Sequence, residues 1–283
     1  MELDQREFKQ LLGFTKEEYS DLLTRYQASS RFRAPISASC SLLMGMISLR
    51  QMPVNLFGGV FFRTSNSVYH ANSQKARQFL HETYKVFVCP RVRGEMRRYP
   101  HLPGPVQFVL DGSEQPVSSS HDPLQETIFF SAKKKQHSVT AIVIMEPGRW
   151  VSHLTKSYPG CITDGSILCD MWNDWSAENL SKGCVALADA GCPGWANIVI
   201  PESQPNTRAL MKERSDIECL FSCVKVFRAC SDRLRLKPAN GQLKVLVAHQ
   251  TAWRTVLGLF NARKCDGNTL EGKFSYISSV SKK

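Results

Sequence analysis

Three carboxylates stand where they could bind a divalent metal ion. Asp111 and Asp189 each follow a short apolar run, and Glu218 lies beside the apolar stripe of an amphipathic segment. Ligands of open α/β sheets bind at the carboxyl ends of the strands. Carboxylate oxygens are the ligands that Mg²⁺ and Mn²⁺ prefer, and a pair of such ions promotes phosphodiester cleavage or transfer. Each aspartate also suits an ordinary turn, which is the simpler alternative.

The residues around Glu218 predict a long helix over 206–230. Its apolar stripe has helical spacing and consists of Ile217, Leu220, Phe221 and Val224. Glu218 lies about 100° from Ile217, at the edge of this stripe. Arg214, Ser222 and Lys225 share its face. This polar ridge fits either a solvated helix face or a surface that presents a carboxylate to a sheet edge and a lysine to a phosphate.

The elements that must position these carboxylates begin after residue 105. Apolar runs predict strands over 106–110, 127–130, 137–145, 150–154 and 184–188, with a helix over 165–172. Strands in succession, followed by alternating strands and helices, indicate a mixed α/β sheet flanked by helices. We place this domain at 106–235, followed by a C-terminal helix and a basic tail over 236–283.

The N-terminal residues 1–90 predict an all-α domain. Helices are expected over 37–52 and 53–62, and a turn at 63–67 precedes a long helix over 67–87. This order fits a helix-turn-helix, in which the second helix reads a DNA groove. An ordinary helical bundle is the alternative. The side chains placed to contact DNA are Arg63, His70, Asn72, Lys75 and Arg77.

Residues 91–105 form a proline-containing basic connector between the two domains. It carries Arg91, Arg93, Arg97 and Arg98, which suit either DNA contact or a solvated linker. The whole chain has 36 Lys and Arg against 25 Asp and Glu, a net charge of +11. Such a surplus favours an acidic partner, and nucleic acid is the leading class.

Several classes of protein are disfavoured. The longest apolar runs fall far short of the roughly 18 residues that span a bilayer, and the first residues lack the apolar core of a signal peptide. We therefore expect neither membrane insertion nor secretion. The ten cysteines contain no C-x-x-C pair, so we expect free thiols rather than a zinc site.

Five segments, taken in order, resemble the catalytic domain of Harbinger-type DDE transposases. They read VLDGSE at 109–114, FFSAKKKQH at 129–137, GCITD at 160–164, LADAGCPG at 187–194 and IECLFSCVK at 217–225. The likeness covers about residues 105 to 230, and the N-terminal helices resemble the helix-turn-helix that often precedes this domain. One departure lies beside the second aspartate, where Cys192 replaces the family's usual aromatic residue.

The resemblance implies a ribonuclease-H-like fold whose metal ligands are Asp111, Asp189 and Glu218, holding two Mg²⁺ or Mn²⁺ ions. Asp164 competes with Asp189 for the second position, because it also follows an apolar strand and a glycine-containing turn. The residues expected to hold phosphates near the site are Lys133, Lys134, Lys135, His137 and Lys225.

The function implied is a nuclear DNA transposase. It would bind terminal inverted repeats, cleave both strands and join the 3′-hydroxyls to a target site. A homodimer and a separate Myb-like DNA-binding protein are candidate partners. Two alternatives stay open: a domesticated relative that binds DNA without transposing, and a metal-dependent nuclease without strand transfer.

Overall fold

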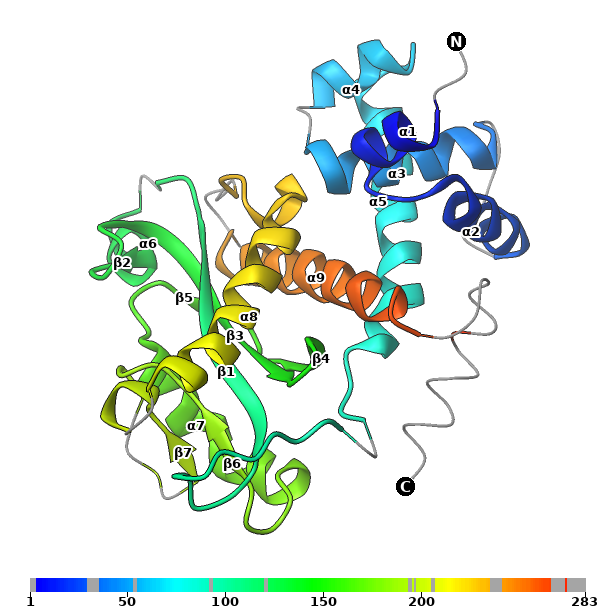
Figure 1. Cartoon of the computed structure of the whole chain (residues 1–283). Coiled ribbons are helices and arrows are strands. Elements are labelled where there is room, and N and C mark those ends of the chain that lie inside the picture. Colours follow the sequence, from blue (N-terminus) through cyan, green and yellow to red (C-terminus); the bar gives the residue numbers. More distant parts are fainter. Residues whose placement is uncertain are drawn as a thin grey trace. The chain divides into compact units, whose positions relative to one another are not determined.

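The computed structural model describes residues 4–29, 36–52, 55–91, 94–119, 122–192, 195, 197–204, 207–234, 241–265 and 273. The chain divides into two compact units, whose elements Figure 1 labels. One unit contains the N-terminal helices, the segment Lys225–Asp232 and the last helix from Thr251 onward. The other runs from Val88 to Val224 and includes Arg233–Gln250.

The N-terminal unit is helical, as predicted. Its helices are α1 (Gln5–Leu12), α2 (Lys16–Ala28), α3 (Ala38–Gln51), α4 (Asn55–Phe61) and α5 (Asn66–Tyr84), followed by the 3₁₀ turn η1 (Lys85–Phe87). Their starts follow from local capping. The Thr15 hydroxyl accepts from the Glu18 backbone N–H, and the Ser65 hydroxyl accepts from that of Val68. The predicted turn between α4 and α5 is confirmed, while Pro53 lies outside the described residues.

The second unit is built on a mixed sheet. Its strands are β1 (Val106–Pro116), β2 (Phe130–Ser131), β3 (Gln136–Glu146), β4 (Trp150–Leu154), β5 (Tyr158–Pro159), β6 (Val185–Leu187) and β7 (Ile198–Val199). The main order is β2-β3-β1-β6-β7, and β4 and β5 also pair with β3. The β1–β3 and β3–β4 pairs are antiparallel, whereas β1, β6 and β7 are parallel.

The helices that follow β1 in the described sequence are α6 (Pro123–Phe129), α7 (Asp164–Asn179), α8 (Thr207–Lys225) and α9 (Gly241–Ala262). Two short 3₁₀ turns, η2 (Pro201–Ser203) and η3 (Arg228–Cys230), lie before and after α8. The predicted mixed α/β class is therefore confirmed. No helix among the described residues is long and apolar enough to cross a bilayer.

Several predicted elements were wrong in extent or type. The helix predicted over 165–172 continues to Asn179 as α7. The strand 106–110 continues through Asp111 and Gly112 to Pro116, because β3 pairs with it over that whole length. The segment 127–130 is mostly the helix α6. The Asp122 carboxylate caps α6 by accepting from the Leu124 backbone N–H, and Pro123 begins it. The long helix ends at Lys225 instead of residue 230, and Phe227 turns into an extended, buried position.

The core on one face of the sheet explains how β1 is oriented. Phe108 and Leu110 of β1 are buried against Ile167, Leu168 and Trp172 of α7. Side chains alternate along a strand, so Val109 and Asp111 point to the opposite face. The apolar packing of α7 thereby fixes which β1 side chains face away from it.

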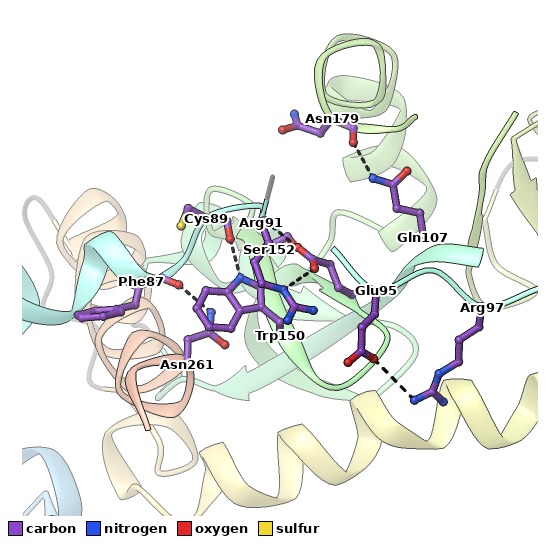
Figure 2. A network of polar contacts seen from close by, with 11 residues as sticks. Phe87, Cys89, Arg91, Glu95, Arg97, Gln107, Trp150, Ser152, Asn179 and Asn261 are labelled. Atoms are coloured by element: carbon purple, nitrogen blue, oxygen red, sulfur yellow. Dashed lines mark hydrogen bonds and ion pairs between the residues drawn. The ribbon is translucent and has the colours of Figure 1, made fainter. Parts of the chain in front are cut away.

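The described part of the basic connector packs on the β3–β4 hairpin (Figure 2). The Trp150 indole N–H donates to the Cys89 carbonyl at 2.7 Å. The Glu146 carboxylate is fully buried and accepts from the Arg91 backbone N–H, from Arg91 Nε and from the Ser152 hydroxyl. Arg91 also lies over the Trp150 ring, with its guanidinium carbon 5.3 Å from the ring centroid. Its charge therefore anchors the start of the connector to the β3–β4 hairpin.

Candidate active site

Asp111 lies within β1, and Asp189 lies two residues beyond the end of the neighbouring parallel strand β6. Val109 of β1 is the partner of Leu187 of β6, and each aspartate lies two residues further along its chain. Strands repeat every two residues and adjacent strands lie about 4.8 Å apart, so the two carboxylates emerge on the same face as neighbours. The sheet register therefore joins residues that are distant in the sequence.

Asp164 approaches the middle of β1 from α7. Thr163 caps this helix, and Asp164 is its first residue. A Cβ built on Gly112 would lie 2.3 Å from Asp164 Oδ1, so the Asp164 carboxylate lies against the bare Gly112 backbone. The Lys133 ammonium lies 3.4 Å from Asp164 Oδ2. Burial lowers the pKa of Lys133, but the attraction of Asp164 outweighs it and the net pKa is raised.

The Asp111 carboxyl interacts electrostatically with several charged neighbours. Burial raises the pKa of the Asp111 carboxyl to about 6. The positive charge of Arg214 and a hydrogen bond from the Gly112 N–H oppose that rise, while Asp164 and Asp189 add to it. A carboxylate whose pKa is raised by burial and like charge holds its ionised form at a cost, which a bound cation would offset.

Arg214 reaches this acidic group from α8. One guanidinium nitrogen lies 3.4 Å from Asp189 Oδ1, and another lies 3.0 Å from Glu202 Oε1. Neighbouring residues of α8 hold the helix in place through two further ion pairs. Glu213 pairs with Arg97, and Asp216 pairs with Arg149.

Glu218 lies one helical turn beyond Arg214 on the same face of α8 and is exposed. Within the described residues, no three acidic, histidine or cysteine side chains form a ready cluster for a metal ion. The structure thus joins Asp111, Asp164 and Asp189 electrostatically and leaves Glu218 on the adjoining helix face.

Comparison with known families gives the decisive observation. The sequence pattern of DDE superfamily endonucleases matches residues 110–261, a span that begins beside Asp111 and includes the other acidic residues of the site. The chain belongs to this family. No curated protein and no solved structure matches it. A mixed sheet flanked by helices fits the fold of a DDE nuclease, and membership implies DNA as the substrate.

Members of this family typically use divalent metals, and the donor set of this DDE endonuclease suits them. Asp111, Asp164 and Asp189 offer only carboxylate oxygens, the ligand class that Mg²⁺ and Mn²⁺ prefer. Burial is the main cause of the raised pKa of Asp111, so a bound cation would offset the cost of ionising this carboxyl. The donor chemistry of the three carboxylates fits a divalent ion.

The basic residues predicted to contact DNA lie in different settings. Those with exposed side chains are Arg63, Lys75, Arg98, Lys133, Lys134, Lys135 and Lys225. Arg77 is half-buried, and burial lowers its pKa. Arg91 and Arg97 are engaged by Glu146 and Glu213, and His137 pairs with Glu126 at 2.5 Å. Arg93 lies outside the described residues.

Sequence reasoning missed the roles of two residues in this DDE endonuclease. Arg214 was placed on the polar ridge of the helix, but its pairing with Asp189 was not predicted. Cys192 was noted only as a departure from the family pattern. Its backbone N–H donates to the Asp189 carbonyl at 3.0 Å. Burial, then the charges of Asp164, Asp189 and Asp111, raise the pKa of its thiol to about 12.

Proposed function

We propose that this protein is a metal-dependent DNA endonuclease of the transposase type, resembling the Harbinger group, which cleaves DNA at element ends and transfers the strands to a target. The observation that carries this proposal is that Asp111 in β1 and Asp189, just after the parallel strand β6, interact electrostatically within a DDE endonuclease domain. With Glu218 from α8, they would supply the ligands for two Mg²⁺ or Mn²⁺ ions. Asp164 is a further candidate ligand.

In this proposal, each group near the strand ends has a defined task. The bound ions supply Lewis-acid chemistry that activates the attacking oxygen and stabilises the leaving one. Asp111 and Asp189 fix where the scissile phosphate must lie. Lys133 is exposed and close to Asp164, so it can reach a phosphate oxygen from the β2–β3 turn. Lys134 and Lys135 extend the same positive surface.

We further propose that residues 1–90 bind the terminal repeats through a helix-turn-helix formed by α4 and α5. The start of α5 presents polar side chains to solvent, among them Asn66, His70, Gln74 and Lys75. The Asn72 amide donates to the Val68 carbonyl of its own helix at 2.8 Å, which occupies one of its two N–H groups. We assign the exposed His70 and Gln74 to base edges, and Asn72 stays a candidate DNA contact.

The test of cleavage uses the purified full chain and DNA that carries the ends of its own element. We expect Mg²⁺-dependent nicking, lost in Asp111→Asn, Asp189→Asn and Glu218→Gln with DNA affinity retained. Asp174→Asn is the matched control, because Asp174 is exposed on α7 and belongs to no proposed site. Full cleavage in excess chelator would refute the metal-dependent proposal.

A second assay separates the alternatives. Pre-cut ends with free 3′-hydroxyls are incubated with a target plasmid and Mg²⁺, and joined products are counted. Joining supports a transposase, whereas nicking without joining indicates a nuclease. DNA binding with neither reaction indicates a domesticated binding protein. Nuclear localisation, a homodimer and a Myb-like partner belong to the same proposal, and tagged protein in cells tests them.

A further inference from the structure

Arg214 has an environment that an ordinary surface arginine lacks. Its side chain is only 13 % exposed, and its guanidinium contacts two carboxylates, one just after β6 and one in η2. Asp189 Oδ1 is 3.4 Å away, and Glu202 Oε1 is 3.0 Å away. Its Nε is buried and finds no acceptor among the described residues.

Asp189, one of the two carboxylates that contact Arg214, is a proposed metal ligand. An ion bound to Asp189 would sit about 2.1 Å from the coordinating oxygen. A guanidinium at its present distance from the same oxygen would then face a divalent charge a few ångströms away, with strong repulsion. Ion binding and the Arg214–Asp189 pair therefore oppose each other.

Glu202, the second carboxylate that contacts Arg214, gives the guanidinium a partner when an ion occupies Asp189. Glu202 lies in η2, outside the acidic group, and forms the shorter of the two contacts. When Asp189 coordinates an ion, Glu202 can still pair with the Arg214 guanidinium, which then need not move into solvent. Arg214 thus contacts one carboxylate of the proposed metal site and one carboxylate outside it.

We propose that Arg214 is an internal counter-cation of the metal-free site, which competes with the divalent ion for Asp189 and is received by Glu202 when the ion binds. This inference rests on the proposed function, because it takes Asp189 as a metal ligand. Arg214 is a positioning residue here: it neutralises the carboxylates before the ion arrives and sets the ion concentration at which the site fills.

The experiment measures Mn²⁺ binding to the full chain without DNA, by the electron paramagnetic resonance signal of free Mn²⁺. Arg214→Gln removes the competitor and should tighten binding about tenfold, the effect of roughly one charge interaction. Glu202→Gln removes the alternative partner, so Arg214 should hold Asp189 more firmly and binding should weaken. Arg208→Gln, an exposed arginine changed in the same way on the same helix, should leave binding unaltered.

A merely structural role for Arg214 would not make these two variants move in opposite directions. In chelator, Arg214→Gln should also melt at a lower temperature, with Mn²⁺ restoring the melting point. Arg214→Lys keeps the charge and should bind Mn²⁺ nearly as the wild type does, which covers the case that the glutamine variant fails to fold.

The outcomes distinguish this inference from the proposed function. Wild-type binding that Asp189→Asn abolishes, together with equal or weaker binding in Arg214→Gln, overturns the competition and leaves the metal site intact. Absence of binding in both the wild type and Arg214→Gln overturns the metal site and the competition together. Binding that appears only in Arg214→Gln supports the competition in its strongest form.

Discussion

Asp111→Asn should make the metal-free protein more stable at neutral and basic pH. Folding raises the pKa of Asp111 from its ordinary 3.8 to about 6, chiefly through burial. Each tenfold change in an ionisation equilibrium is worth about 1.4 kcal/mol, so the ionised carboxylate costs the folded state about 3 kcal/mol. Asparagine is neutral and nearly isosteric, and its carbonyl can still accept from the Gly112 N–H, which now donates at 2.8 Å.

The sign of the pH dependence follows from the raised pKa. Below the unfolded value of 3.8 both states hold the proton, and Asp111 costs nothing. As the pH rises from about 4 to about 6, the unfolded chain loses its proton first and the folded state loses stability. The advantage of Asp111→Asn should therefore be about 1 kcal/mol near pH 4.5 and about 3 kcal/mol near pH 8.

Urea denaturation in excess chelator measures this difference. The chain has 5 tryptophans, and Trp150, Trp172, Trp175 and Trp195 belong to the catalytic unit, so tryptophan emission reports mainly on that unit. Mg²⁺ should stabilise the wild type and have little effect on the variant. An Asp111→Asn protein no more stable than the wild type near pH 8, or an advantage independent of pH, would refute the electrostatic reasoning.

Three further predictions concern the connector, the site and DNA binding. Glu146→Ala leaves the half-buried Arg91 without its carboxylate and should lower the free energy of unfolding by about 3–5 kcal/mol in urea; a loss below about 1 kcal/mol would contradict a buried anchor. Gly112→Ala places a Cβ 2.3 Å from Asp164 Oδ1 and should weaken Mn²⁺ binding with the circular dichroism spectrum retained; unchanged affinity would show that Asp164 is not needed. DNA affinity should fall linearly with salt on logarithmic axes, by about 0.9 per neutralised phosphate in a titration by fluorescence anisotropy; a flat line would exclude phosphate-dominated binding.

Local patterns were sufficient to predict most of the elements. The helices of the N-terminal unit follow from caps such as Thr15 with Glu18, whose hydrogen bonds span three residues. The strand over 137–145 follows from the apolar run Ala141–Met145, which suits a buried position. Asp111 and Asp189 were recognisable as a pair because each follows a short apolar run in the sequence. These signals need only near neighbours in the sequence.

Elements whose form depends on a distant partner were not predictable in this way. Asp111–Gly112 resembles a turn by itself, but pairing with β3 extends the strand through it. The segment 127–130 resembles a strand by itself, but the cap at Asp122 starts a helix before it. A strand needs a partner, and sequence alone does not reveal where that partner ends.

The charged side chains show most clearly which features depend on the sequence alone and which depend on tertiary contacts. The sequence by itself determined the excess of positive charge, the acidic residues that follow apolar runs and the basic connector. Only the tertiary structure decided that Arg91 is taken by the buried Glu146 and that Arg214 lies against Asp189. Coulomb energy depends on distance and burial, and both arise when remote segments pack together, so identical residue types become anchors, counter-ions or DNA contacts only in the folded chain.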